Sequence, residues 1–375
     1  MKKSSKIRLT AIVLALILLL PLAACGKGDT AQPDASSAPA ATEDIRITPT
    51  EASSVKTVLY ETPDFSLYIP EGWTVEAGGT NIMHSIHVYD PKNPVNQMFV
   101  LLKADALLHS QAGKDAWQYN ADMGNTGAAV MAAAPVLSDP STEGFFNIFS
   151  EYADFAERVE SSYAGYRFPR FDNFAVTDRF AQKSPFLSSA LGEALLRANF
   201  SQDGKDGEGL FSASVVDFGS FAIASGFNGY QLTQADGGAY MAYNIIAVTA
   251  ERDTFIEWES ILTGCMKTLE YSDSFVSAAK AASDEQLAQA MEFSRNASAA
   301  ADAMMAAWES RSLSQDIMSQ KQSDATLGFD RLYDTETGKI YRADLGWYDG
   351  YTGDRLQMVG SDELYAEPIS GYIYK

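Results

Sequence analysis

The sequence predicts an α+β fold in which an antiparallel sheet is flanked by helices, and three observations support this prediction. Short runs of alternating apolar and polar residues, typical of half-buried strands, occur at 65–103 and again at 194–250. A helical pattern at about 112–186 separates the two groups and is predicted to be an insertion. The stretch 276–327 contains neither Gly nor Pro and is rich in Ala, which favours one long helix, or two with a break near Ser310–Ser314.

The first 24 residues have the layout of a bacterial export signal. Met1–Thr10 carries four basic residues and no acidic one, and Ala11–Leu20 is uninterrupted apolar sequence. The apolar run ends at Ala24 and is too short for a membrane-spanning helix, which needs about 20 residues, so we expect a cleaved leader. Leu22-Ala23-Ala24-Cys25 resembles the lipobox of bacterial lipoproteins. The resemblance implies that Cys25 receives a diacylglycerol and becomes the new N-terminus, the alternative being an ordinary signal peptide that ends in cysteine.

Residues 25–54 are predicted to be a disordered tether. Small and polar residues dominate this segment, so it cannot bury enough apolar surface to offset the entropy of ordering. A coil of this length spans about 30 Å. Acyl chains on Cys25 would hold the protein stably on a bilayer. We therefore expect a lipid-anchored protein on the extracytoplasmic face of the cell membrane.

The composition is that of an acidic globular protein. With 46% hydrophobic and 21% charged residues, the roughly 320 residues beyond the tether suffice for two or three domains. The formal net charge of −21 becomes −25 once the four basic residues of the leader are removed. Such a chain repels nucleic acid, so no nucleic-acid partner is expected. With Cys25 lipidated only Cys265 remains, which excludes a disulfide framework.

The sheet domain is predicted to span residues 55–275. A run that alternates Phe65, Leu67 and Ile69 with polar residues ends in a Pro-Glu-Gly turn, which indicates a half-buried strand. The run QMFVLLK at 97–103 is nearly continuous apolar sequence and indicates a strand buried on both faces. Within the insertion, the segment STEGFFNIFSEYADFAERVE repeats aromatic residues at helical spacing behind a Ser/Thr start signal.

The second half of the sheet domain is predicted to contain a hairpin, a strand and a helix. Two β-like runs at 194–218 flank a turn rich in Gly and Asp, although 187–196 also fits a helix. Tyr240–Ala250 reads as a strand. A helix follows, with a capping box from Thr254 to Glu257 and an inward stripe. The stripe consists of Phe255, Trp258, Ile261, Leu262 and Cys265.

These elements resemble the PsbP-like domains. The resemblance rests on a strand that ends in YIPEGW, a helix FIEWESIL and a short closing strand KTLEY. It covers about residues 60–271, provided that the helical middle is an insertion. It implies an α/β/α sandwich with an antiparallel sheet between helices, and a role in binding or assembling other proteins, because most members of that family act in this way.

Residues 328–375 are predicted to form a small β-meander, because short aromatic runs alternate with Asp-x-x-Thr-Gly and Asp-Gly turns. Four aromatic side chains are candidates for an exposed surface that binds glycans or peptide: Tyr341, Trp347, Tyr348 and Tyr351. The interpretation that we favour is that they form the core of a small module. The long helix is expected to dock on the sheet domain through Met304, Met305 and Trp308, because so weakly amphipathic a helix gains most of its stability from packing.

No catalytic or metal-binding motif is found. His84 and His87 lie three apart in a predicted strand and point to opposite faces, which does not suit a metal site. His109 has no local partners of a catalytic triad, and Cys265 is expected to be a core residue. The remaining acidic groups are interpreted as turn residues rather than cation ligands: Asp203–Gly209, Asp334, Glu336, Asp349 and Asp354.

The sequence therefore predicts a non-catalytic, lipid-anchored protein that binds or helps to assemble another envelope protein, with no cofactor. Two alternatives from other classes remain open. A carboxylate-based envelope hydrolase needs no sequence motif, because paired Asp or Glu residues suffice. A solute- or glycan-binding lipoprotein is the other alternative, although no alternating βα pattern is present to build two matched lobes.

Overall fold

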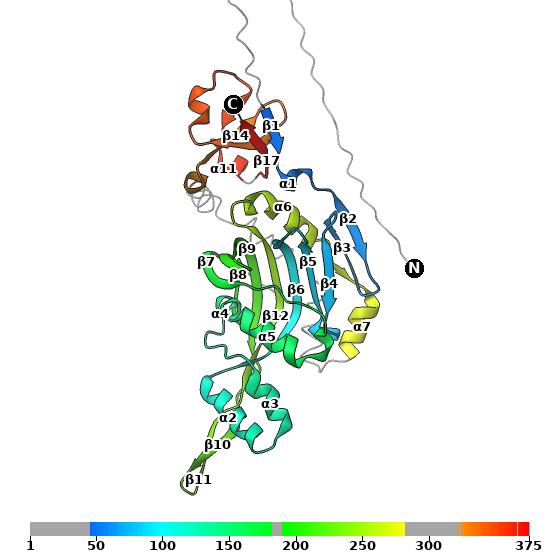
Figure 1. The fold of residues 1–375 in the computed structure, drawn as a ribbon, viewed down its shortest axis with the longest axis vertical. Helices are drawn as coiled ribbons and strands as arrows, with labels where there is room; N and C mark the ends of the chain where they lie inside the picture. Colours follow the sequence, from blue (N-terminus) through cyan, green and yellow to red (C-terminus); the bar gives the residue numbers. More distant parts are fainter. Residues whose placement is uncertain (1–45, 182–189, 282–320, 322–323, 366, 375) are drawn as a thin grey trace, which may run out of the picture. The chain divides into compact units, whose positions relative to one another are not determined.

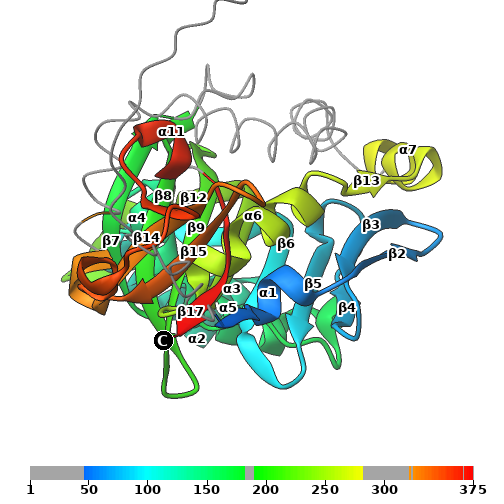
Figure 2. The same cartoon turned by 90° about the horizontal axis from the view of Figure 1, so that it is seen from above.

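The structure is a computed structural model that describes residues 46–181, 190–281, 321, 324–365 and 367–374. Helices and several mostly antiparallel sheets make up this part of the chain (Figures 1 and 2), so the predicted α+β class is confirmed. Across these residues, no helix combines the length and the apolar character needed to cross a membrane. Cys25, the leader and most of the tether lie outside the described residues.

The largest sheet has seven antiparallel strands (Figure 1). In spatial order they are β4 (Thr74–Gly78), β5 (Ser85–Asp90), β6 (Asn93–Leu108), β12 (Ala239–Glu251), β9 (Lys205–Asp217), β8 (Ala190–Gln202) and β7 (Asp172–Ala181). The central strands β6 and β12 are buried along most of their length. This burial explains the apolar run at 97–103, which lies within β6.

The two faces of this sheet bury separate cores, because successive side chains along a strand point to opposite faces. On β6, Val100 and Leu102 belong to one core, whereas Phe99 and Leu101 belong to the other. Two helices supply side chains to the first core: α6 (Phe255–Met266) and α7 (Asp273–Ala281). Two others cover the second core: α4 (Thr142–Asn147) and α5 (Phe149–Val159).

The predicted insertion is helical only in its first part. It contains α2 (Gln111–Asp122), α3 (Thr126–Ala133), α4, α5 and the short 3-10 helix η2 (Ser161–Tyr163). Residues 172–181 form the edge strand β7 instead, and 190–202 form β8 rather than a helix. In β7 the half-buried Phe174 and Val176 alternate with exposed residues and pack on the second core. The boundary of the insertion at about 186 is therefore wrong.

Ordered structure begins earlier than the predicted Val55. Strand β1 (Arg46–Pro49) and helix α1 (Glu51–Ser54) occupy the end of the predicted tether. Thr50 caps α1 by accepting a hydrogen bond from the Ser53 backbone N–H, and Ala52 is buried in the first core. Ile47 is the only large apolar residue of this segment, which gains its partners from distant parts of the chain. Local composition therefore predicted the wrong boundary.

A second sheet contains three antiparallel strands in the order β13 (Glu270–Tyr271), β3 (Phe65–Pro70) and β2 (Thr57–Glu61). Phe65, Leu67 and Ile69 of β3 are buried in the first core, as their alternation predicts. The short helix η1 (Asn81–Met83) precedes β5.

The C-terminal sheet is not a simple meander. Its order is β1, β17 (Ile369–Tyr374), β15 (Lys339–Asp344), β14 (Phe329–Asp334) and β16 (Leu356–Met358). The β14–β15 hairpin with its Asp-x-x-x-Gly turn is present as predicted, but β17 runs parallel to β15 and pairs with the N-terminal β1. The helices η4 (Trp347–Gly350) and α11 (Asp362–Tyr365) complete this part.

Helix α6 buries the predicted stripe but does not use the predicted capping box. Phe255, Trp258 and Cys265 lie in the first core. Thr254 makes no capping bond, since its hydroxyl donates to the Glu251 carbonyl oxygen at 3.2 Å. The carboxylate of Glu257 instead lies 3.1 Å from the Arg342 guanidinium of β15. Burial raises the pKa of Glu257, and Arg342 only partly opposes this.

A hairpin that the sequence analysis did not find joins β9 to β12. It consists of β10 (Ala222–Asn228) and β11 (Gln231–Asp236), which pair antiparallel around the two-residue turn Gly229-Tyr230. Together with the preceding loop, residues 218–236 are called the arm below. Helix α2 packs beside the arm, where the Trp117 ring nitrogen donates to the Gly237 carbonyl oxygen at 3.0 Å.

The long helix predicted at 276–327 is described only at its two ends. Helix α7 covers Asp273–Ala281, and residues 324–327 are helical before Gly328, whose φ is +78°. Met304, Met305 and Trp308 lie outside the described residues, so their docking on the sheet domain stays a prediction.

Gly144 in α4 is expected to be irreplaceable by alanine. A Cβ at this position would lie 2.0 Å from the Asp139 carbonyl oxygen, and the backbone around it is fixed because Gly144 donates to the Ser141 hydroxyl. Gly144→Ala should therefore lower the free energy of unfolding by about 1–3 kcal/mol, as overpacking typically does. Gly264 in α6 is the matched control, since no atom lies within 4 Å of its Cβ position. Gly264→Ala should raise stability by about 0.5–1 kcal/mol, and equal effects in denaturant titrations would contradict this packing.

Candidate functional site

The three-stranded sheet presents one face to the core and an outer face to solvent. Side chains alternate along β2 and β3, so the Cα partners Leu59 and Tyr68 share a face with the partners Glu61 and Ser66. Glu270 of β13 joins them, because its Cα partner is also Ser66. These five residues are called the outer face below. Leu59 is 51% exposed and Tyr68 44% exposed.

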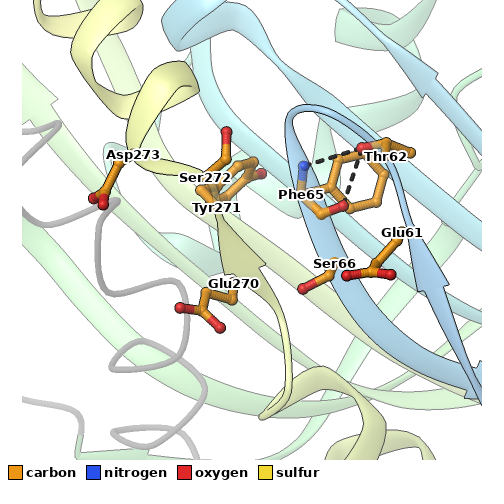
Figure 3. A pocket seen from close by; sticks show the side chains of 8 residues that line it. All are labelled: Glu61, Thr62, Phe65, Ser66, Glu270, Tyr271, Ser272 and Asp273. Atoms are coloured by element: carbon orange, nitrogen blue, oxygen red, sulfur yellow. Dashed lines mark hydrogen bonds between the residues drawn. The ribbon is translucent and has the colours of Figure 1, made fainter.

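A hollow of about 220 Å³ lies at one end of the outer face. It is lined by Glu61, Thr62, Phe65, Ser66, Glu270, Tyr271, Ser272 and Asp273. Figure 3 shows Ser66 between Glu61 and Glu270, in agreement with the strand register. Phe65 and Tyr271 belong to the core beneath the hollow, so its rim is formed by carboxylates and hydroxyls.

Backbone hydrogen bonds hold the hollow in shape. The hydroxyl of Thr62 accepts from the Phe65 backbone N–H at 3.0 Å and donates to the Phe65 carbonyl oxygen at 3.0 Å (Figure 3). The Thr62 backbone N–H donates to the same carbonyl oxygen at 2.9 Å. The Ser272 N–H donates to the Asp64 carbonyl oxygen at 2.8 Å, which joins β13 to the β2–β3 turn. The hollow is therefore a preformed feature of the sheet.

The chemistry of the outer face suits recognition rather than catalysis. Its lining contains three carboxylates and neither Lys nor Arg, so it attracts a cationic group. Leu59 and Tyr68 beside it offer apolar contact. Glu61 and Glu270 are both exposed on an open sheet face, where nothing excludes water from a reacting bond. This pair of carboxylates gives no support to the alternative of a hydrolase.

The aromatic residues of the C-terminal sheet do not form the predicted exposed surface. Tyr341 and Trp347 are only 6% and 8% exposed, and Tyr348 and Tyr351 are half-buried. All four pack together with Leu332 in the core of this sheet. A small sheet with few other large apolar residues uses its aromatics for its core, as the favoured interpretation has it, and the four residues do not form the candidate glycan or peptide surface.

The two histidines of the H-x-x-H pattern lie in different environments. His84 precedes β5 and contacts the rings of Phe65, Tyr271 and Phe275. A ring nitrogen of His87, Nε2, lies 2.7 Å from Gln97 Oε1. No cluster of three or more potential metal ligands is found among the residues that the structure describes.

The burial of His84 predicts acid sensitivity. Burial lowers its pKa to about 4, and nearby Asp64 opposes this only in part. Between pH 6.5 and 4 the unfolded chain therefore binds a proton that the folded chain does not. The free energy of unfolding consequently decreases as the pH is lowered through this window. His84→Phe should remove up to about 3 kcal/mol of this loss at pH 4 while keeping the ring contacts.

Denaturant titrations from pH 7 to pH 4 measure this effect. Burial lowers the pKa of His87 in the same direction, so the variant should keep a residual acid sensitivity. Parallel stability curves for the wild type and His84→Phe would contradict the assignment.

A group with the composition of a catalytic triad lies at the base of the arm. His109 Nδ1 is 2.7 Å from Asp236 Oδ2, and the Ser220 hydroxyl donates to the same oxygen at 3.1 Å. In a catalytic triad the serine hydroxyl and the carboxylate contact different nitrogens of the histidine ring. Here Ser220 and Asp236 both lie near Nδ1 of His109, and Nε2 lies 3.2 Å from the Asp217 carboxylate. The arrangement is a structural clamp rather than a nucleophile with its base.

This clamp closes the arm at its attachment to the sheet. Asp236 also accepts backbone hydrogen bonds from Phe221 and Gly238 through Oδ1. The hydrogen bond from His109 lowers the pKa of Asp236. Sequence analysis missed the clamp because His109 and Asp236 are 127 residues apart and neither lies in a motif.

The other candidate residues have structural roles. Cys265 is 3% exposed in the first core, and burial raises its pKa to about 11, which makes the thiol unreactive. Asp334 receives two hydrogen bonds from the Arg355 guanidinium, which holds the pKa of Asp334 at about 2. Arg355 also lies 3.3 Å from Glu336. The Arg355 side chain therefore lies between Asp334 and Glu336, where these acidic residues could otherwise have bound a cation. Within the stretch interpreted as a hairpin turn, only Asp203 and Gly204 form the β8–β9 turn, and Lys205–Gly209 are the first residues of β9.

No known family model matches the chain, and neither does any curated protein. The outer face is consequently identified from its geometry alone.

Proposed function

We propose that this chain is a lipid-anchored, extracytoplasmic protein that binds another envelope protein through the outer face. The observation that carries the proposal is the juxtaposition of the exposed pair Leu59 and Tyr68 with the acidic hollow. On the inner face of this sheet, the apolar side chains of β3 and β13 are buried. Those of β2 are less covered, since Val58 is 38% exposed and Tyr60 is half-buried. Large apolar residues left on the outer face therefore mark a surface for a partner.

The partner is a protein segment with apolar side chains next to Lys or Arg. Apolar contact on Leu59 and Tyr68 would supply most of the affinity, since aromatic residues dominate interface energetics. A cation placed in the hollow would meet the Glu61 and Glu270 carboxylates, which adds orientation and a faster association. The acidic net charge of −21 favours such a partner over an acidic one.

Membrane attachment through Cys25 and the PsbP-like resemblance support the same role. The lipobox Leu22-Ala23-Ala24-Cys25 would place the chain in the envelope, where its partner must also reside. An antiparallel sheet with helices beside it agrees with the architecture that the resemblance implies. Members of that family mostly bind or help to assemble other proteins, which fits a surface without catalytic groups.

Labelling of bacterial cells with radioactive palmitate tests the anchor. The wild-type chain should incorporate label and remain with the membrane fraction. The variant Cys25→Ser should incorporate none and should keep its leader, because the lipobox cysteine is required before cleavage. Equal labelling of both chains, or release of the wild-type protein from membranes by salt alone, would contradict the proposal.

Charge reversal tests the binding surface. Glu61→Lys combined with Glu270→Lys should abolish co-purification of an envelope protein with the tagged chain. Asp206→Lys is the matched control, because Asp206 is an exposed acid near the start of β9, in a different sheet from the outer face. The control should retain the partner. Loss of the partner in both variants would indicate a non-specific charge effect.

A further inference from the structure

We propose that the arm is the contact through which two copies of this chain associate. In this contact, β11 of one copy pairs antiparallel with β11 of the other, and Tyr230 of each copy enters a hollow at the base of the other arm. The arm is a surface distinct from the outer face.

The first observation is an open strand edge. β10 and β11 form a sheet of two strands, and no described strand pairs with the other edge of β11. The other edge of β10 is covered, since the Asn120 amide of α2 donates to the Ala224 carbonyl oxygen at 2.7 Å. The bulge of the hairpin also lies on β10, between Ala224 and Gly226. β11 contains no Lys, Arg or Pro, the residues with which proteins protect exposed edges.

The second observation is the absence of charge. Residues 218–235 contain no Asp, Glu, Lys or Arg, although 21% of the whole chain is charged and its net charge is −21. Two copies of so acidic a protein repel each other over most of their surfaces. Contact through the arm brings uncharged surfaces together and keeps the like charges apart.

The third observation is the exposure of large side chains on the arm. Phe227 and Leu232 are Cα partners near the turn and are 64% and 50% exposed, and the Tyr230 side chain is fully exposed. Phe218 and Phe221 at the base are 60% and 53% exposed. Together these side chains offer roughly 600 Å² per copy, if each large side chain presents about 200 Å² when free. Two copies would bury about 1,200 Å², the lower limit for a specific interface.

The fourth observation indicates that the partner of the arm is a second copy of this chain. A hollow of about 500 Å³ lies at the base of the arm, lined by Ser220, Phe221, Ala222, Gln234, Ala235 and Asp236. If β11 pairs with itself about a two-fold axis through Thr233, then Gln231 lies opposite the partner's Ala235. Tyr230 then lies opposite the partner's Asp236, which lines that hollow. Tyr230 and the hollow belong to the same arm, so the two-fold axis brings the Tyr230 of each copy to the hollow of the other.

The clamp at the base keeps the hollow in shape before association. Asp236, one of its lining residues, is fixed by His109, Ser220 and two backbone N–H groups. The Trp117 ring lies 6.0 Å from the ring of Phe221 in an edge-on contact and supports it from α2. The arm therefore loses little conformational freedom when a second copy binds.

Sedimentation equilibrium of residues 26–375 tests association. This form retains all contacts of the compact unit 44–375. Between about 1 and 200 µM the wild type should show a monomer–dimer equilibrium that strengthens from about 0.15 to 0.5 M NaCl, because salt screens like charges. Thr233→Lys, which protects the edge, and Tyr230→Ser should each weaken the dimer at least about tenfold. Leu191→Ser, at a 53% exposed position of β8, is the control and should leave it unchanged.

Disulfide formation tests the register. The buried Cys265 does not react, so single cysteines report on the arm. An oxidised equimolar mixture of Q231C and A235C should form the mixed disulfide, and each variant alone should form much less. A monomer at all concentrations, unchanged association of Thr233→Lys, or equal cross-linking in the single variants would overturn the proposal. Flotation of a monomeric chain with phosphatidylcholine vesicles would also overturn it, because the arm would then face lipid.

Discussion

Replacement of Trp258 by alanine should cost about 3–5 kcal/mol of unfolding free energy, the range typical of a buried Trp. Trp258 lies on the inward stripe of α6, is 2% exposed and packs 5.4 Å from the ring of Trp73. The ring fills the space between α6 and the large sheet, together with Leu262 and Val248. These neighbours belong to different elements, so they cannot collapse into the cavity without moving the helix.

Chemical denaturation monitored by far-UV circular dichroism measures this loss. Leu345→Ala is the control, because Leu345 is 60% exposed and surface changes usually stay within about 0.5 kcal/mol. A loss below about 1 kcal/mol for Trp258→Ala would contradict the docking of α6 on the sheet.

Arg331→Met should destabilise the C-terminal sheet by about 3–5 kcal/mol, as the loss of one partner of a buried ion pair does. The Arg331 side chain is 1% exposed and that of Asp324 is 6% exposed. The guanidinium donates to both oxygens of Asp324, at 2.7 and 3.1 Å, and to the Tyr365 carbonyl oxygen at 3.1 Å. Burial raises the pKa of Asp324, and the charge of Arg331 counteracts this increase. Removal of the cation therefore leaves the charge of a buried carboxylate without compensation.

Hydrogen exchange of the β14 and β15 amides, together with denaturant titration, measures the effect. The double variant Arg331→Met with Asp324→Leu should recover most of the stability, since replacing both partners with apolar groups is often neutral. If the single and double variants were equally unstable, shape rather than charge would explain the role of Arg331.

Local patterns predicted those elements whose stability depends on near neighbours in the sequence. The β8–β9 hairpin, the buried run of β6 and the stripe of α6 follow from alternation, apolar content and helical spacing. The C-terminal sheet did not follow, because β1 pairs with β17 at the other end of the chain and β15 runs parallel to β17. A disordered tether was predicted up to residue 54, because the sequence does not show which distant partners a short polar segment will meet.

The candidate site was even less visible in the sequence. The outer face combines Glu61, Ser66 and Glu270, which only the strand register brings together. The clamp of His109 and Asp236 likewise exists only because the fold brings together residues that are far apart in the sequence. The aromatic cluster around Trp347 was a candidate surface, but it forms a core, as the favoured interpretation has it, because a sheet of short strands needs large side chains to exclude water. The arm was missed because its two strands contain few large apolar residues, and five of their 13 residues are Gly, Ser or Ala.

Photochemical cross-linking in cells tests the central claim most directly. The photoreactive residue p-benzoylphenylalanine replaces Tyr68 on the outer face or, as the control, Tyr374 of β17, two tyrosines that are 44% and 49% exposed. We expect one discrete adduct with an envelope protein from position 68, none from position 374, and loss of the adduct when Glu61 and Glu270 are reversed to Lys. The same adducts from both positions, or an adduct at 68 that survives the charge reversal, would contradict the assignment of the outer face as the recognition surface.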